Sequence, residues 1–278
     1  MGKAEGYREF LRKPATGNHF VQVYQDDGLL VDAICYFISD ELKPAEGVVI
    51  IATPEHREAV IAQLSEQSEA LQKALQSDQF VFYDAGMLLS SFMVDGMPDK
   101  EKCFSVIIPI LEQAARKYKS VRAYGEMVDI LWQAGNKIAA STLEKFWNEL
   151  IQRHAFSLLC AYRVDNLDPA AYHGDIECLC STHTHFIPAQ DFDLLEKAVS
   201  KASENVMGVS LSGMMGSIAK FPHPTTIMPA AQASLLYISK TMPVTTDYIL
   251  TQVRSHLSKA AKPAREKSAY QTNGLAPD

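Results

Sequence analysis

Tyrosine and acidic side chains stand at the ends of several short apolar runs in this sequence. Phenol and carboxylate groups can hydrogen-bond a polar ligand, act as a general acid or base, or coordinate a metal ion. We therefore predict that they line a ligand-binding pocket. A simpler role stays open for the acidic members, because acidic side chains also cap helices and stabilise a first helical turn. The residues are Tyr24, Asp26, Asp27, Asp84, Tyr124, Glu126 and Tyr162.

The segment Thr53-Pro54-Glu55-His56 follows another apolar run and has the composition of a helix start. Thr53 suits the N-cap, Pro54 the first helical position and Glu55 the first turn. His56 would then lie near the end of a strand, where it either contacts a ligand or hydrogen-bonds to a neighbouring side chain. We therefore add Thr53 and His56 to the predicted ligand-binding residues.

Cysteine and histidine gather in one short stretch, where Cys180, His183 and His185 form a C-x₂-H-x-H pattern and Cys178 precedes it. Zinc sites usually take their ligands from two separated pairs, and the sequence shows no second pair with suitable spacing. Cys180, His183 and His185 are thus weak candidates for a metal site. The alternative is a helix end at which His183 caps carbonyl groups. We expect no bound metal ion and no cofactor.

Common catalytic signatures are missing from the sequence. The turn Gln25–Leu29 does not match the phosphate-binding pattern G-x-x-x-x-G-K-[ST] and contains no lysine, and its two aspartates would repel phosphate. Neither G-x-S-x-G nor H-E-x-x-H occurs. We therefore expect that the protein is not an enzyme. A degenerate P-loop-type ATPase, or a metal-dependent enzyme that uses Glu126 and Asp26, remains an alternative.

Predicted strands and helices alternate five times along the chain, and this order places the candidate ligand-binding residues. The strands are short apolar runs, and the segments between them carry apolar residues at helical spacing. This order predicts an α/β fold with a mostly parallel sheet of five or more strands and helices on both faces. Ligands bind such sheets at the carboxyl ends of the strands. The predicted strands are residues 19–24, 48–52, 80–83, 121–124 and 156–162, and the predicted helices include residues 29–42, 54–75 and a helix that Asp99 caps.

The stretch Val121–Leu150 is the predicted centre of the core. It contains both tryptophans of the chain, Trp132 and Trp147, and a second helix that opens at Lys137. Large aromatic side chains bury ~150–250 Å² each and dominate core energetics.

The chain is expected to have four parts: a polar tail at 1–18, the α/β domain at 19–188, a helical C-terminal region at 189–260 and a disordered tail at 261–278. A helix is expected at 168–180, and residues 181–188 interrupt it. Residues 191–207 form a clear amphipathic helix, residues 208–229 have little helical promise, and residues 229–258 contain two helices that break at Met242-Pro243.

Composition limits the partners and the location. The 278-residue chain has a formal net charge of −7 at pH 7, so no basic field indicates direct binding of nucleic acid or of an anionic membrane. The N-terminus has no apolar core of a signal peptide, and no apolar run is long enough to span a bilayer. Five cysteines, an odd number, suit reduced thiols. We expect a cytoplasmic protein.

Six separated motifs stand in the order found in one protein family. They are His19-x-x-Gln22-x-Tyr24-x-Asp26-Asp27, Ile51-Ala52-Thr53-Pro54-Glu55-His56-Arg57, Phe92-Met93-x-Asp95-Gly96-x-Pro98-Asp99, Arg122-x-Tyr124-Gly125-Glu126-Met127-Val128, Leu143-Glu144-x-x-Trp147-Asn148 and Leu159-Cys160-x-Tyr162. Between about His19 and Pro188 the chain therefore resembles the MEDS domain, the methanogen/methylotroph sensory domain.

This resemblance implies a RecA/KaiC-like α/β fold that has lost its P-loop. It also implies a sensory role in prokaryotic signal transduction or transcriptional control, with simple hydrocarbon derivatives as proposed ligands. The expected partners are a small-molecule ligand, a signalling protein and a second copy of the chain in a homodimer. The alternative is a protein-interaction or dimerisation module that regulates a kinase or a transcription factor. Residues 189–260 match no output module.

Overall fold

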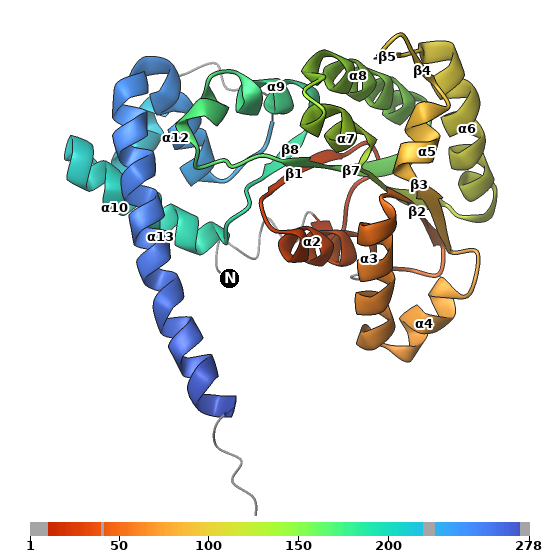
Figure 1. The fold of residues 1–278 in the computed structure, drawn as a ribbon, viewed down its shortest axis with the longest axis horizontal. Coiled ribbons are helices and arrows are strands. Elements are labelled where there is room, and N and C mark those ends of the chain that lie inside the picture. Colours follow the sequence, from red (N-terminus) through yellow and green to blue (C-terminus); the bar gives the residue numbers. More distant parts are fainter. Residues whose placement is uncertain (1–10, 40–41, 219–225, 273–278) are drawn as a thin grey trace, which may run out of the picture. The chain divides into compact units, whose positions relative to one another are not determined.

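The computed structural model describes residues 11–39, 42–218 and 226–272, and the chain divides into two compact units (Figure 1). The first unit consists of residues 1–165, 177–189 and 224–227. The second consists of residues 166–176, 190–223 and 228–278. Most of the predicted polar tail, residues 1–10, lies outside the described part of the chain.

A six-stranded parallel sheet in the order β3-β2-β6-β7-β1-β8 forms the centre of the first unit. Most of its residues are buried, as expected for strands that helices cover on both faces. The structure therefore confirms the predicted α/β class and all five predicted strands. The bounds are β1 His19–Tyr24, β2 Glu46–Ala52, β3 Phe80–Asp84, β6 Ser120–Gly125, β7 Phe156–Arg163 and β8 His185–Ile187.

Helices α2 and α3 cover one face of this sheet, and α7 and α8 cover the other (Figure 1). A short antiparallel hairpin of β4 and β5 follows α5, and its turn residues Asp95 and Gly96 have φ of 49° and 78°. The bounds are α2 Asp27–Ser39, α3 Pro54–Gln67, α4 Glu69–Leu75, α5 Ala85–Ser90, β4 Met93–Val94, β5 Met97–Pro98, α6 Lys100–Lys117, α7 Met127–Gln133, α8 Lys137–Arg153 and α9 Asp175–Thr182.

Side-chain caps fix where several of these helices begin. Thr53 accepts a hydrogen bond from the amide of His56, and Pro54 stands at the first position of α3, as the sequence predicts. Asp99 caps α6 through the amide of Lys102 over 2.9 Å. Thr53 thereby sets the β2–α3 junction at the carboxyl edge of the sheet, and Asp99 sets the junction between the β4–β5 hairpin and α6.

The core of the first unit is built around the predicted stretch. The Trp147 side chain is only 1% exposed, and its ring packs edge-on against Phe156 at 6.4 Å between centroids. Trp132 packs edge-on against Tyr162 at 5.2 Å. Strand β6, from the same stretch, lies inside the sheet between β2 and β7.

Helices make up the second unit and bury one continuous apolar cluster. Gly208 ends α10 with φ of 71°, a left-handed conformation that favours glycine. The bounds are η1 Pro169–Tyr172, α10 Phe192–Met207, α11 Leu211–Ile218, α12 Ala230–Thr241 and α13 Pro243–Thr272. The amphipathic helix and the break at Met242-Pro243 are confirmed. None of the described helices is both long and apolar enough to cross a membrane.

Five local expectations differ from the structure. The single helix expected at 54–75 is interrupted at Ser68, whose extended backbone ends α3 and whose side chain caps α4. The helix expected at 168–180 is divided into η1 and α9, with Gly174 at φ of 128° between them. Residues 185–187, expected only to interrupt a helix, form β8, because pairing with β1 buries even so short a strand.

The stretch 208–229 contains α11 despite its glycine and serine residues, whose helix propensity is low. Leu211 and Met214 enter the apolar cluster of the second unit, and this packing outweighs propensity. Residues 219–225 of the stretch lie outside the described part of the chain. Helix α13 continues to Thr272, into the tail expected to be disordered, and residues 273–278 are not described.

Candidate functional site

Glu126 joins strand β6, helix α7 and the start of helix α3 at the carboxyl edge of the sheet. It follows β6, is 2% exposed and precedes α7. One carboxylate oxygen accepts a hydrogen bond from the backbone amide of Thr53 at 2.5 Å. The other accepts one from the Tyr124 hydroxyl at 2.9 Å and contacts Nδ1 of His56. Glu126 thereby connects the β6–α7 junction to the β2–α3 junction.

Asp129, in the first turn of α7, is the second buried carboxylate of this edge. It accepts hydrogen bonds from the Tyr24 hydroxyl at 2.6 Å, the Gln133 amide at 2.8 Å and the Arg163 backbone amide at 2.9 Å. Burial raises the pKa of Asp129, and burial together with the Asp129 charge raises the pKa of Tyr24 well above its usual value. The phenol of Tyr24 therefore stays protonated and acts as a donor.

Asp27, at the first position of α2, completes the set. Its carboxylate forms an ion pair with the Arg163 guanidinium, and its Oδ1 lies 3.6 Å from Nε2 of His56. The hydrogen bond to Glu126 raises the pKa of His56 against the opposing effect of burial. The Arg163 guanidinium also lies 4.9 Å above the Tyr24 ring. We call Glu126, Asp129, Asp27 and their side-chain partners the carboxyl-edge network.

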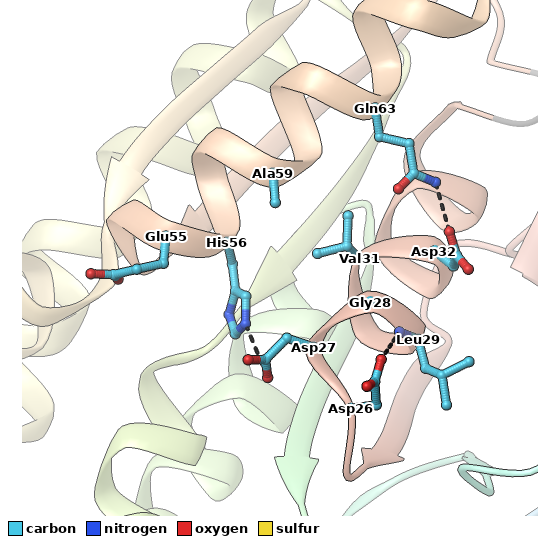
Figure 2. Close-up of a pocket in the computed structure, with 10 residues that line it drawn as sticks. All are labelled: Asp26, Asp27, Gly28, Leu29, Val31, Asp32, Glu55, His56, Ala59 and Gln63. Carbon is cyan, nitrogen blue, oxygen red and sulfur yellow. Dashed lines mark hydrogen bonds and ion pairs between the residues drawn. The ribbon is translucent and has the colours of Figure 1, made fainter.

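A cleft of about 570 Å³ opens between α2 and α3 beside this network (Figure 2). Asp27 and His56 belong to both the cleft and the network. Within the cleft, Asp26 caps α2 through the Leu29 amide at 3.2 Å, and Asp32 accepts a hydrogen bond from the Gln63 amide at 2.8 Å. Of the described residues, those that line the cleft are Asp26, Asp27, Gly28, Leu29, Val31, Asp32, Glu55, His56, Ala59 and Gln63.

Charge gives this α2–α3 cleft a definite chemical preference. Four of its lining side chains are carboxylates and one is a histidine, whereas neither lysine nor arginine occurs among the described lining residues. Such a surface repels anions and favours neutral hydrogen-bond donors and cations. Its volume falls within the ~300–1,000 Å³ typical of small-molecule sites.

A second group of polar side chains is buried on the face of the sheet that α8 covers. His19 of β1, Glu144 of α8, Cys160 of β7 and His183, which follows α9, place one donor atom each within 4.8 Å of one another. Nε2 of His19 lies 3.3 Å from Glu144 and 3.4 Å from the Cys160 sulfur, and Nε2 of His183 lies 3.2 Å from Glu144. We call these four residues the His–Glu–Cys cluster.

Burial lowers the pKa of His19 and raises that of the Cys160 thiol. Burial alone would raise the pKa of Glu144, but the two histidines beside it hold that pKa below its usual range. The cluster therefore places one carboxylate, two imidazoles and one thiol together in a buried site.

Comparison with known families decides what kind of domain carries these two sites. The family model described as "MEDS: MEthanogen/methylotroph, DcmR Sensory domain" matches residues 18–184. The chain belongs to the MEDS family. Its first unit is thus the main part of a sensory domain, and a sensory or signalling role follows from the family. No curated protein and no solved structure matches the chain.

The MEDS match confirms the family resemblance seen in the sequence, and it contains both groups of polar residues. Seven of the nine predicted ligand-binding residues lie together at the carboxyl edge or in the α2–α3 cleft; whether they bind a ligand remains a prediction. They are Tyr24, Asp26, Asp27, Thr53, His56, Tyr124 and Glu126.

Two of the predicted ligand-binding residues have other contacts in the MEDS domain. Asp84 caps α5 by accepting a hydrogen bond from the Met87 amide at 2.8 Å. Tyr162 donates its hydroxyl hydrogen to Glu144 at 2.6 Å and so contacts the His–Glu–Cys cluster. Among the described residues, neither belongs to the lining of the α2–α3 cleft.

The three weak metal candidates, Cys180, His183 and His185, do not lie in one group. His183 belongs to the group of described metal-ligating side chains, whereas Cys180 and His185 do not. The His185 ring stacks on Phe20 at 4.6 Å, and burial lowers its pKa to about 4. The expected helix-end role of His183 is also present, because its Nδ1 lies 2.7 Å from the Leu179 carbonyl oxygen.

Sequence reasoning missed Asp129, and it did not count Arg163 among the ligand-binding residues. The signal for Asp129 was its spacing of three residues from Glu126, which places both on one side of a helix start. Arg163 directly follows Tyr162 at the end of a predicted strand, so it also stood at the expected edge. The partners of the two residues depend on the strand order, which the sequence did not give.

Proposed function

We propose that this MEDS protein is a non-catalytic sensor that binds a small neutral or cationic molecule in the α2–α3 cleft. The observation that supports the proposal best is the position of His56. One ring nitrogen faces Asp27 within the cleft, and the other contacts Glu126 in the carboxyl-edge network. A ligand that competes for Asp27 or for His56 would therefore change contacts at the β1–α2, β2–α3 and β6–α7 junctions.

The chemistry of the lining suggests the class of ligand. Short alcohols and amines are simple hydrocarbon derivatives that offer the hydrogen-bond donors that the carboxylates of the cleft require. Carboxylates and phosphates would meet four acidic side chains there, of which Asp27 is paired with Arg163 and His56. The family's association with hydrocarbon derivatives and the charge of the cleft thus favour the same kind of molecule.

Energetics limits how far such a ligand shifts the protein between two states. Moving a population from 1:99 to 99:1 requires a preference of about 5.5 kcal/mol for one state. Very small ligands reach at most ~1.5 kcal/mol per heavy atom, so a two-carbon compound produces a partial response. The cleft volume of about 570 Å³ leaves room for a larger homologue.

Output is proposed to pass through protein–protein contacts of the second unit, either with a signalling partner or with a second copy in a homodimer. Val244 and Tyr248 lie one helical turn apart on α13 and are 69% and 64% exposed. Large apolar side chains exposed together are typical of interaction surfaces. Light scattering of the full chain and of a V244D/Y248D double variant tests this part, since an unchanged mass of a dimer would exclude α13 as the contact.

Thermal-shift and NMR screening of the full chain tests the proposed ligand site. Straight-chain alcohols and alkylammonium ions are expected to stabilise the protein, and the effect should be lost in Asp27→Asn. The control is Glu69→Gln, because Glu69 is exposed on α4 and pairs only with Lys73 among the described residues. Absence of any effect, or a response to carboxylates alone, would contradict the proposal.

A further inference from the structure

The His–Glu–Cys cluster brings four metal-ligating groups together from four separate parts of the chain. His19 and Cys160 lie on the same face of the sheet, because Val21 pairs with Cys160 and alternate residues of a strand share a face. Glu144 reaches them from α8, and His183 reaches them from the turn before β8. All four side chains are buried.

Hydrogen bonds fix which nitrogen of each histidine carries its hydrogen. The Asn148 side-chain amide donates to the Thr182 carbonyl at 2.8 Å, so its oxygen faces Nδ1 of His19 at 3.0 Å. Nδ1 of His183 lies 2.7 Å from the Leu179 carbonyl oxygen, which can only accept. Both imidazoles are therefore protonated at Nδ1, and each directs Nε2 into the cluster.

Both histidines direct Nε2 at the same carboxylate. Nε2 of His19 lies 3.3 Å from Oε2 of Glu144, and Nε2 of His183 lies 3.2 Å from Oε1. The His183 side chain is fully buried, and apart from this Glu144 contact its Nε2 has no hydrogen-bond partner among the described residues. Burying a polar atom without a partner is costly, so the site requires a cation or additional protons.

The distances suit a metal ion better than a loose polar contact. Nε2 of His19, the Cys160 sulfur and Oε2 of Glu144 lie 3.3, 3.4 and 3.8 Å from one another, and Nε2 of His183 lies 3.2 Å from the other carboxylate oxygen, Oε1. A tetrahedral site with metal–ligand bonds of ~2.0–2.3 Å has edges of roughly 3.3–3.8 Å. The longest separation, 4.8 Å, needs only a side-chain adjustment.

We propose that His19, Glu144, Cys160 and His183 bind one divalent transition-metal ion, and that the donor set of two nitrogens, one sulfur and one oxygen selects zinc. Imidazole, thiolate and carboxylate are the usual zinc ligands, and four protein ligands form a closed, structural site. Partners outside the cluster hold the ligands as such sites require: Asn148 and the Leu179 carbonyl orient the imidazoles, and Tyr162 donates to Glu144.

A metal at this position would connect β1, β7, α8 and the turn before β8. It lies apart from the α2–α3 cleft, since the two sets share no residue. The inference therefore goes beyond the proposed ligand site and does not depend on it. On metal binding the Cys160 thiol loses its proton to solvent, and four bonds to the protein ligands replace the waters that the free ion carries.

Metal analysis of the full-length protein, purified without chelator and dialysed, tests the proposal. We expect about one zinc ion per chain in the wild type. Cys160→Ser and His183→Ala should lose most of it. The matched control is Cys103→Ser, because Cys103 is equally buried, on α6, and outside the cluster. Equal metal retention by the wild type and by all cluster variants would overturn the proposal.

Cobalt substitution keeps the test independent of whether a variant folds. Wild-type protein stripped of metal and loaded with Co²⁺ should show a sulfur-to-cobalt charge-transfer band and the intense visible bands of a tetrahedral site. The band from sulfur should persist in Cys103→Ser. The proposal fails if the wild-type protein binds neither Zn²⁺ nor Co²⁺ and neither ion changes its melting temperature. In that case protons, and not a metal ion, occupy the cluster.

Discussion

The Nε2 atom of His56 lies 3.6 Å from the Oδ1 atom of Asp27, and this contact joins the first turn of α3 to the first turn of α2 (Figure 2). The same imidazole contacts Glu126, which holds the Thr53 amide and the Tyr124 hydroxyl. A change at the cleft can therefore reach β6 and α7 through a single side chain. Under the proposed function, this connection is the route by which ligand binding would change the conformation of the domain.

Replacing Glu126 with Gln should destabilise the fold without abolishing it. The amide group of Gln would place a donor against one of the three groups that now donate to the carboxylate. Leaving a buried donor unsatisfied costs about 1–3 kcal/mol. Urea unfolding measures the loss in free energy of unfolding, and Glu69→Gln is the exposed control. Equal stability of the two variants would contradict the three hydrogen bonds assigned to the Glu126 carboxylate. A ligand response unchanged in Glu126→Gln would remove Glu126 from the signalling route.

The contribution of His56 to stability should depend on pH with a definite sign. Its folded-state pKa is raised by Glu126, so the protonated form is favoured by folding. The stabilisation relative to His56→Gln should be complete below about pH 6.5, the unfolded value, and should decline as pH rises through the folded-state pKa. The groups that face His56 are Glu126 and Asp27.

Denaturant unfolding of wild type and His56→Gln across this range measures that difference. Removal of Asp27 as Asp27→Asn should lower the folded-state pKa of His56, which NMR titration of the ring detects. A difference in stability that grows with increasing pH would have the wrong sign and would contradict the assigned contacts.

Asp84 provides a test of a predicted site residue that the structure shows in a capping role. Asp84→Ala removes the acceptor of the Met87 amide and should cost ~0.5–2 kcal/mol. Asp84→Asn should retain most of the cap. Because Asp84 is not among the described residues that line the cleft, neither variant should change ligand binding once folded. Lost binding in a folded Asp84→Asn would return this residue to the site.

Trp147→Ala should be among the most destabilising single changes in the first unit. The side chain is 1% exposed and packs against Phe156. Truncating a buried Trp costs about 3–5 kcal/mol. Ile138→Ala, also on α8 but 73% exposed, should change stability by no more than ~0.5 kcal/mol. Thermal and urea unfolding compare the two, and a small loss for Trp147→Ala would show that this stretch is not the centre of the core.

The strands and helix starts that the sequence predicted correctly are those that depend on local patterns. Apolar runs predicted the five long strands, and Thr53 and Asp99 predicted helix starts, because caps and periodicity act within a few residues. Strand β8 was not predicted, because its three residues, His185–Ile187, are too few to show a pattern and depend on pairing with β1. Helix α11 was not predicted, because packing and not helix propensity stabilises it.

The same distinction explains the two candidate sites. The carboxyl-edge residues could be predicted, since parallel strands end at one edge whatever their order. The His–Glu–Cys cluster could not, because positions 19, 144, 160 and 183 meet only through the β1–β7 register and the docking of α8. From the sequence, Cys180, His183 and His185 were only weak candidates for a metal site, and of the three only His183 joins the cluster.

The most direct test of the account is an NMR titration of the isotope-labelled full chain with three matched two-carbon compounds, ethanol, ethylammonium and acetate. We expect ethanol or ethylammonium to shift the amide signals of Asp27, Gly28 and His56 in wild type and in Glu69→Gln. The shifts should be absent in Asp27→Asn and with acetate. Shifts that acetate causes most strongly, or that persist unchanged in Asp27→Asn, would contradict ligand sensing in the α2–α3 cleft.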